Sequence, residues 1–144
     1  MDAEAGNAIE DFAVTALRAY GFKAGTPVCR SGRARSAGYP DIRVTDGSRT
    51  AYVDCKTYSA KTKFQTLRSF YLSPSPDPKI TEDAFHLLMS FELIPEMRSG
   101  RSVFVPRRWG IYELARLNLH VKFECNASNR ELYTDESRLY SGNV

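Results

Sequence analysis

The segment GYPDIRVTDGSRTAYVDCKTY, residues 38–58, constrains the fold more than any other part of the sequence. Its two β-rich runs, residues 42–44 and 51–53, flank Asp46-Gly47-Ser48, the kind of glycine-containing polar stretch that tight turns require. The segment therefore predicts a β-hairpin. When the turn is centred on Gly47 and Ser48, antiparallel register pairs Ile42 with Val53.

The same register places Asp41 directly opposite Asp54. Strand side chains alternate between faces, so the residues of the second strand divide into two sets. One face carries Tyr52, Asp54 and Lys56, and the other carries Ala51, Val53 and Cys55. Lys56 is therefore expected beside both acids.

Two carboxylates facing each other across a hairpin repel, because cross-strand Cβ atoms are only about 5 Å apart. A divalent cation removes that repulsion, and Mg²⁺ typically takes one or two carboxylates, with water and substrate phosphate as its other ligands. A neighbouring lysine can orient or deprotonate a water, or stabilise charge on a phosphate under attack. The alternative is a hairpin without a functional site, at a solvated edge of the sheet, in which the positive charge of Lys56 only offsets the negative charges of the two aspartates.

The acid-x-lysine spacing occurs twice in the chain, which provides an internal control. Asp77-Pro78-Lys79 also follows a proline, but it lies in SPSPDPK, where the prolines rule out a central strand. The spacing alone is weak evidence. The strand-turn-strand context distinguishes the first copy from the second.

The 144 residues, of which 42% are hydrophobic and 26% charged, fit one soluble domain over residues 1–144. The apolar stretches are too short for a membrane span and the acidic N-terminus lacks a signal-peptide pattern, so we expect a cytoplasmic protein. Cys29, Cys55 and Cys125 form no zinc-like pairs with the two histidines, which predicts reduced cysteines and no structural zinc.

A first helix is expected over residues 7–20, with Asn7 as N-cap, Gly21 as the stop and an amphipathic apolar face. Glu10 flanks that face. An acid in the first turn of a helix is favourable in itself, so helical spacing alone gives Glu10 no function.

Elsewhere the patterns are coarser. Residues 57–75 are expected to be partly helical before a proline-rich turn, and the apolar run at residues 84–94 is assigned to a buried strand. A short strand is expected at residues 102–105, a helix at 108–117 and another strand at 120–126.

Two groups of basic residues could contact a nucleic acid, although the net charge of +3 does not require one. The first group lies in a Gly/Ser loop that could equally be a solvated loop, and the second is interleaved with aromatic residues. The groups are Arg30, Arg33 and Arg35, and Lys61, Lys63 and Arg68.

The residues PD before one strand and DCK at the end of the next resemble the signature of the PD-(D/E)XK nuclease superfamily, in particular type II restriction endonucleases. The N-terminal GNAIEDFAVTALRAYGF adds to the resemblance, since many members begin with an acid-bearing helix that ends in a Gly-aromatic pair. The resemblance implies an α/β restriction-endonuclease-like fold with a central mixed β-sheet flanked by helices.

The resemblance also implies roles for individual residues. Asp41 and Asp54 would be metal ligands, completed by the backbone carbonyl of Cys55. Lys56 would lie beside the attacking water, and Glu10 would support the metal site from the helix. The implied reaction is hydrolysis of a DNA phosphodiester with Mg²⁺, for which Mn²⁺ could substitute.

Three functions are compatible with these residues. The first is a site-specific endonuclease that acts as a homodimer on double-stranded DNA, because symmetric targets suit twofold partners. The second is a Holliday junction resolvase or another structure-selective nuclease of the same fold. The third, from a different class, is a non-catalytic DNA-binding module that keeps the nuclease fold.

Overall fold

The computed structural model describes residues 3–35, 37–66, 68–119, 128–132, 134–136 and 138–140. Its elements, in chain order, are α1 (Ala3–Ala19), β1 (Lys23–Gly25), β2 (Ile42–Thr45), β3 (Thr50–Tyr58), β4 (Phe85–Arg98), β5 (Arg101–Glu113), the 3-10 turn η1 (Leu114–Arg116) and α2 (Asn129–Leu132).

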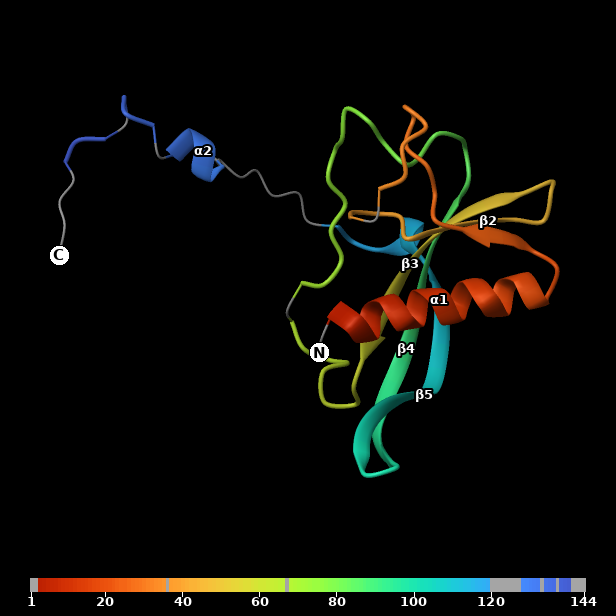
Figure 1. Ribbon diagram of the computed structural model, residues 1–144. Coiled ribbons are helices and arrows are strands. Elements are labelled where there is room, and N and C mark those ends of the chain that lie inside the picture. Colours follow the sequence, from red (N-terminus) through yellow and green to blue (C-terminus); the bar gives the residue numbers. More distant parts are fainter. Residues whose placement is uncertain are drawn as a thin grey trace.

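The strands form one five-stranded sheet in the order β1-β2-β3-β4-β5 (Figure 1). Neighbouring strands are antiparallel except for β3 and β4, which run parallel. A parallel pair needs a crossover connection, and here residues 59–84 supply it. The mixed sheet confirms the expected α/β fold.

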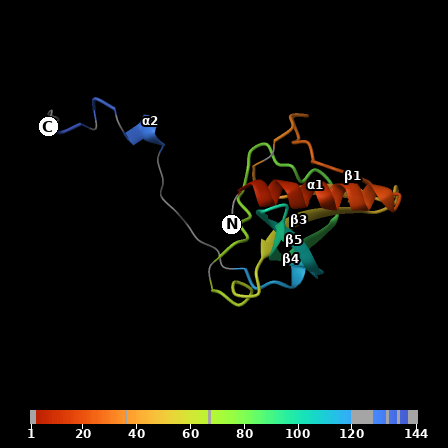
Figure 2. The same ribbon diagram turned by 60° about the horizontal axis from the view of Figure 1, so that its bottom comes forward.

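Helix α1 lies along one face of the sheet (Figure 2). Its buried residues Ile9 and Ala13 share a hydrophobic core with Val53 and Cys55 of β3. The helix begins at Ala3, so the prediction that Asn7 caps it is wrong; the preceding Ala-Glu-Ala-Gly stretch includes strong helix formers that extend it. The predicted stop is confirmed, because Gly21 has a φ of +89° just past the end of α1.

The hairpin of β2 and β3 has the register expected from sequence. Ile42 pairs with Val53 and Val44 with Ala51. The turn is closed by Asp46, whose Oδ1 accepts hydrogen bonds from the backbone N–H groups of Ser48 and Arg49. Gly47 has a φ of +100°, which explains the glycine at this position.

The apolar run at residues 84–94 is confirmed as a strand: β4 begins at Phe85 and continues past residue 94 to Arg98. The predicted helix at residues 108–117 is wrong, because β5 continues to Glu113 and only η1 follows. Long β4 offers a pairing partner along the whole of β5, and residues such as Trp109 and Ile111 favour strands. Pro106 fits within β5 because it lies at an irregularity of an edge strand.

The predicted partial helix within residues 57–75 is also wrong. Strand β3 continues to Tyr58, and the described part of residues 59–75 contains turns and irregular chain. Prolines at 74 and 76 disfavour a helix at the end of this segment. The strand expected at residues 120–126 falls outside the described residues.

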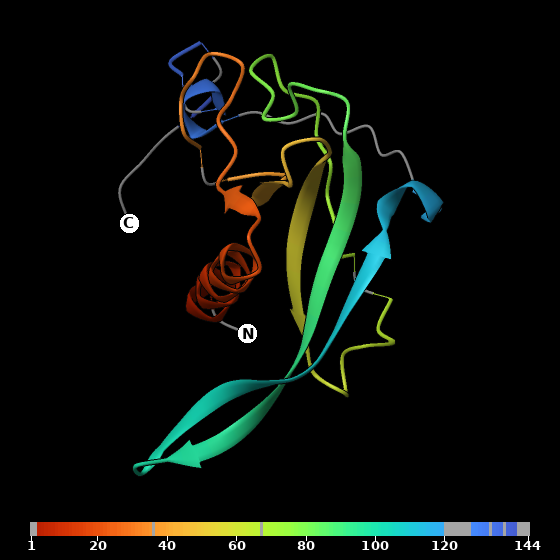
Figure 3. The same ribbon diagram turned by 90° about the vertical axis from the view of Figure 1, so that its right-hand side faces the viewer.

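The β4–β5 hairpin projects beyond α1 at the far end of the sheet (Figure 3). Within the described ranges, no helix is long and apolar enough to cross a membrane.

The position of the core predicts a contrast between two residues of β4. Leu93 is 4% exposed and belongs to the core, whereas Met97, four residues further along β4, is 72% exposed. We expect Leu93→Ala to lower the free energy of unfolding by about 2–5 kcal/mol because it leaves a cavity. Met97→Ala, the matched control, should change it by about 0.5 kcal/mol or less. Urea denaturation measures both, and equal effects would contradict this placement of the core.

Candidate active site

Asp41 lies immediately before β2 and is fixed to β3 by two contacts. Its backbone N–H donates to the Val53 carbonyl at 3.0 Å, and its Oδ2 accepts a hydrogen bond from the Cys55 backbone N–H at 2.7 Å. Because the register pairs Ile42 with Val53, the next position outward places Asp41 across from Asp54. The carboxylate of Asp41 is therefore held at the point where β2 begins.

Asp54 is the buried acid of the site, with 4% of its surface exposed. Its Oδ2 lies 2.8 Å from the Lys56 Nζ. Apart from this ion pair, that oxygen has no hydrogen-bond partner in the described part of the chain. Burial raises the pKa of Asp54, and Asp41 raises it further, while Lys56 lowers it. Burial of a carboxylate is costly unless a partner compensates its charge, and Lys56 is the partner that the structure describes for this oxygen.

Lys56 is the partly open member of the site, since 34% of its side chain is exposed. Tyr52, Asp54 and Lys56 alternate with the residues of β3 that pack beneath α1, so the predicted division of faces is confirmed. Lys56 can therefore contact Asp54 while its ammonium remains accessible to a substrate.

Glu10 approaches from α1 and is partly buried. Burial raises its pKa, and the negative charge of Asp41 raises it further, followed by a smaller effect of Asp54. Lys56 and Lys79 act in the opposite direction. These mutual effects mean that Glu10 lies within electrostatic range of both aspartates, which the helical pattern alone did not establish.

The donors present fit a hard cation such as Mg²⁺ better than zinc. Among the described residues, no group of three or more His, Cys, Asp or Glu side chains is placed so that it could hold a metal ion by itself. Burial raises the pKa of the Cys55 thiol to about 12, which keeps it neutral. Two carboxylates and a backbone carbonyl suit an ion that retains several waters, and one of these carboxylates is that of Asp54, which is paired with Lys56.

The six basic candidates are all exposed. Arg33 pairs with Asp77 at 3.7 Å, and the Lys63 Nζ lies 5.5 Å from the centre of the Phe64 ring. The remaining four are Arg30, Arg35, Lys61 and Arg68. Their exposure is compatible both with DNA contacts and with ordinary solvation.

The sequence did not identify Lys79 as a residue near the candidate site, because the prolines around Asp77-Pro78-Lys79 rule out a central strand. The triplet is indeed outside the sheet, yet Lys79 is 5% exposed and its Nζ donates to the Gly38 and Pro40 carbonyls just before Asp41. Asp77 binds the backbone N–H and hydroxyl of Ser31. Both charged residues of the control triplet therefore have structural partners, and those of Lys79 directly precede Asp41.

The raised pKa of Asp54 predicts how pH affects stability. A carboxyl group whose pKa is higher in the folded state loses its proton less readily there, so the folded state loses stability as pH rises through the raised value. In metal-free buffer at pH 8 we expect Asp54→Asn to melt above wild type. The difference should shrink as pH falls toward the ordinary carboxylate pKa of about 4.

Asp77→Asn is the control with the opposite sign, because hydrogen bonds from Ser31 lower the pKa of Asp77. It should melt below wild type at neutral pH and approach it only in acid. Differential scanning calorimetry across pH measures both variants. An Asp54→Asn protein that melts below wild type at pH 8 would contradict this description of the buried acid.

Comparison with known proteins gives a family match that includes all residues of the candidate site. The model of the type II restriction enzyme MjaV family matches residues 2–136. The type II restriction enzyme MjaV of Methanocaldococcus jannaschii is 38% identical over 147 aligned positions, which cover 95% of this chain and 61% of that relative. No solved structure matches the chain. The chain belongs to the type II restriction enzyme MjaV family.

Proposed function

We propose that the protein is a metal-dependent DNA endonuclease that cleaves at specific sites; its relative is named a type II restriction enzyme. The observation that carries the proposal is Asp54, a buried acid whose Oδ2 lies 2.8 Å from the Nζ of the partly exposed Lys56 and which the strand register places across from Asp41. Such an arrangement costs stability, and a phosphodiesterase site gives a reason for it. The chain spans 61% of the relative's length, so the activity of the whole relative is extended to it here as a proposal.

The metal ion would be Mg²⁺, with Mn²⁺ as a possible substitute. Asp41 and Asp54 would hold it, together with the backbone carbonyl of Cys55. The N–H and C=O of one strand residue point to the same side, and the Cys55 N–H points to Asp41. When bound, such an ion supplies Lewis-acid activation of water and neutralises phosphate charge.

Lys56 would orient the attacking water and stabilise the negative charge that develops on the phosphate. Its contact with Asp54 fixes the ammonium beside the proposed ligands. Glu10 would accept a hydrogen bond from solvent at the site, and its raised pKa brings its proton exchange closer to neutral pH.

Double-stranded DNA would be the substrate, with the exposed basic residues as contacts to phosphate. A homodimer would cut both strands of a symmetric site, because each chain contributes one such constellation. The cytoplasm, where cellular DNA is accessible, would be the location. The family match favours this function over a junction resolvase or a non-catalytic DNA-binding module.

Two substitutions test the catalytic assignment by different routes. Asp54→Ala removes a proposed ligand and should abolish cleavage while DNA binding in Ca²⁺ is retained or tightened, because a carboxylate near phosphate is lost.

Lys56→Ala should lower the cleavage rate by about 10²–10³-fold without weakening metal affinity, because a lysine ammonium has no lone pair to offer a metal.

The assay uses plasmid, phage and branched DNA with Mg²⁺, and its controls are Asp83→Ala and Lys23→Ala, both exposed and outside the site. Discrete fragments support a site-specific enzyme, whereas nicking of branched DNA alone indicates a structure-selective nuclease. Wild-type protein that binds DNA but cuts none of these substrates, or an Asp54→Ala protein that cuts normally, would refute the proposal.

A further inference from the structure

Lys79 is a buried cation outside the Asp54-Cys55-Lys56 triplet. Only 5% of its surface is exposed, and its Nζ donates to the Gly38 carbonyl at 2.6 Å and to the Pro40 carbonyl at 2.9 Å. These two carbonyls flank Tyr39. One ammonium therefore holds the backbone on both sides of that residue.

The second of these carbonyls belongs to the residue immediately before Asp41. Asp41 is held on its other side by β3, through the Val53 carbonyl and the Cys55 N–H. Two anchors thus fix the position of this carboxylate: the sheet holds Asp41 directly, and Lys79 holds the chain that leads into it. Loss of the second anchor would leave residues 38–40 free to shift relative to Asp54.

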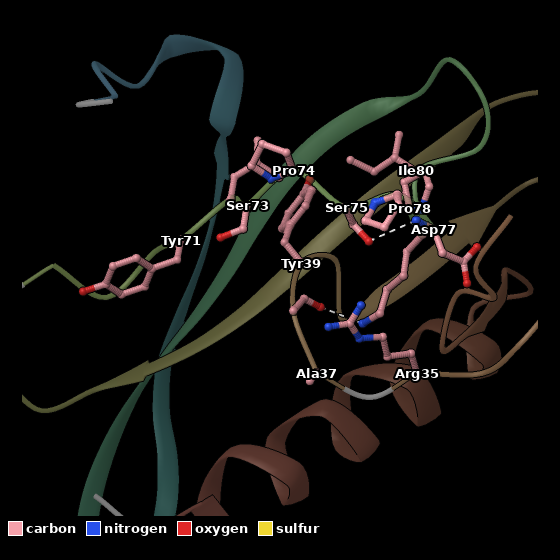
Figure 4. Close-up of a pocket in the computed structure, with 14 residues that line it drawn as sticks. Arg35, Ala37, Tyr39, Tyr71, Ser73, Pro74, Ser75, Asp77, Pro78 and Ile80 are labelled. Atoms are coloured by element: carbon pink, nitrogen blue, oxygen red, sulfur yellow. Dashed lines mark hydrogen bonds between the residues drawn. The ribbon is translucent and has the colours of Figure 1, made fainter. Parts of the chain in front are cut away.

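Lys79 is delivered by a segment, residues 77–82, that is itself fixed at several points. The Pro78 carbonyl accepts from the Arg30 N–H, the Thr81 N–H donates to the hydroxyl of buried Tyr52, and Glu82 pairs with Arg43 at 2.6 Å. Figure 4 shows Pro78 and Asp77 of this segment and Tyr39 of the loop before Asp41 around one pocket. Residues 77–82 therefore link the loop that precedes Asp41 to β3.

The charge of Lys79 also matters for the acids around it. Burial lowers the pKa of Lys79, and the negative charge of Asp41 opposes that effect. If Lys79 only donated two hydrogen bonds, a neutral donor could replace it. Its positive charge also acts on the carboxyl groups of Asp41, Asp54 and Glu10, and so offsets their mutual repulsion.

We propose that Lys79 is a positioning residue for the active site: it fixes the backbone of residues 38–40 and thereby sets the Asp41 carboxylate against Asp54 for metal binding. The part of this inference that concerns cleavage rests on the proposed function. The part that concerns metal binding can be measured without any DNA.

Lys79→Met tests the inference, because methionine preserves much of the apolar stem and removes the ammonium. Partners behind the direct ligands typically change metal affinity or activity by about 10–100-fold. We expect the dissociation constant for Mn²⁺, measured by electron paramagnetic resonance, to rise by at least about tenfold, and the cleavage turnover to fall by a similar factor. DNA binding in Ca²⁺ should remain near the wild-type value.

Leu93→Ala is the matched control for stability. Leu93 belongs to the hydrophobic core, none of whose members is among residues 38–40 or 77–82. The substitution should lower the melting temperature while Mn²⁺ affinity and turnover stay within about threefold of wild type, because Lys79 keeps its contacts with the Gly38 and Pro40 carbonyls. Equal losses in Leu93→Ala and Lys79→Met would overturn the proposal, since Lys79 would then act only through general stability.

Lys79→Gln covers the case in which the methionine variant does not fold. Glutamine keeps N–H donors but is one atom shorter and neutral, so it should lose Mn²⁺ affinity in the same direction. Wild-type affinity in either folded variant, or failure of both to fold, would overturn a specific role in positioning. If wild-type protein cleaves no DNA but Lys79→Met still loses Mn²⁺ affinity, the proposed function fails and the role of Lys79 stands.

Discussion

The antiparallel pairing of β2 with β3 is the constraint on which the rest of the site depends. It places Asp41, immediately before β2, across from Asp54 in β3, and a shift of one residue would move Asp54 and Lys56 to the face covered by α1. The turn at Gly47 fixes that register locally. The core beneath α1 fixes it globally, because Val53 and Cys55 are buried only when the alternate residues point the other way.

The electrostatics of the site follow from this geometry. Two aspartates and Glu10 share a partly buried region, and burial raises the pKa of both Glu10 and Asp54. Lys56 and Lys79 offset part of the repulsion, one by contact with Asp54 and the other from behind the loop that leads into Asp41. Exposed ion pairs contribute little to stability, whereas a buried acid near others is costly. That cost is consistent with a site kept for metal binding rather than for stability.

Local signals predicted the parts of this fold that depend on neighbouring residues. The hairpin register, the stop of α1 at Gly21 and the division of faces in β3 could all be derived from turn chemistry and alternation. Residues 108–117 could not, because pairing with the long β4 outweighs a helix-like pattern that contains Trp109 and Ile111. Lys79 was missed for a related reason: a buried lysine that binds carbonyls some forty positions away leaves no local pattern. The prolines correctly exclude a strand there, but they say nothing about where the side chain goes.

Crystallography with Mn²⁺ is the most direct measurement of the central claim, because the anomalous signal of manganese locates the ion without reference to activity. Crystals of the wild-type chain soaked in Mn²⁺ should show an anomalous peak between the Asp41 carboxylate, the Asp54 carboxylate and the Cys55 carbonyl, since oxygen groups are the ligands that hard divalent ions prefer. A fully occupied peak elsewhere, or none while Asp54 remains paired only with Lys56, would contradict the account.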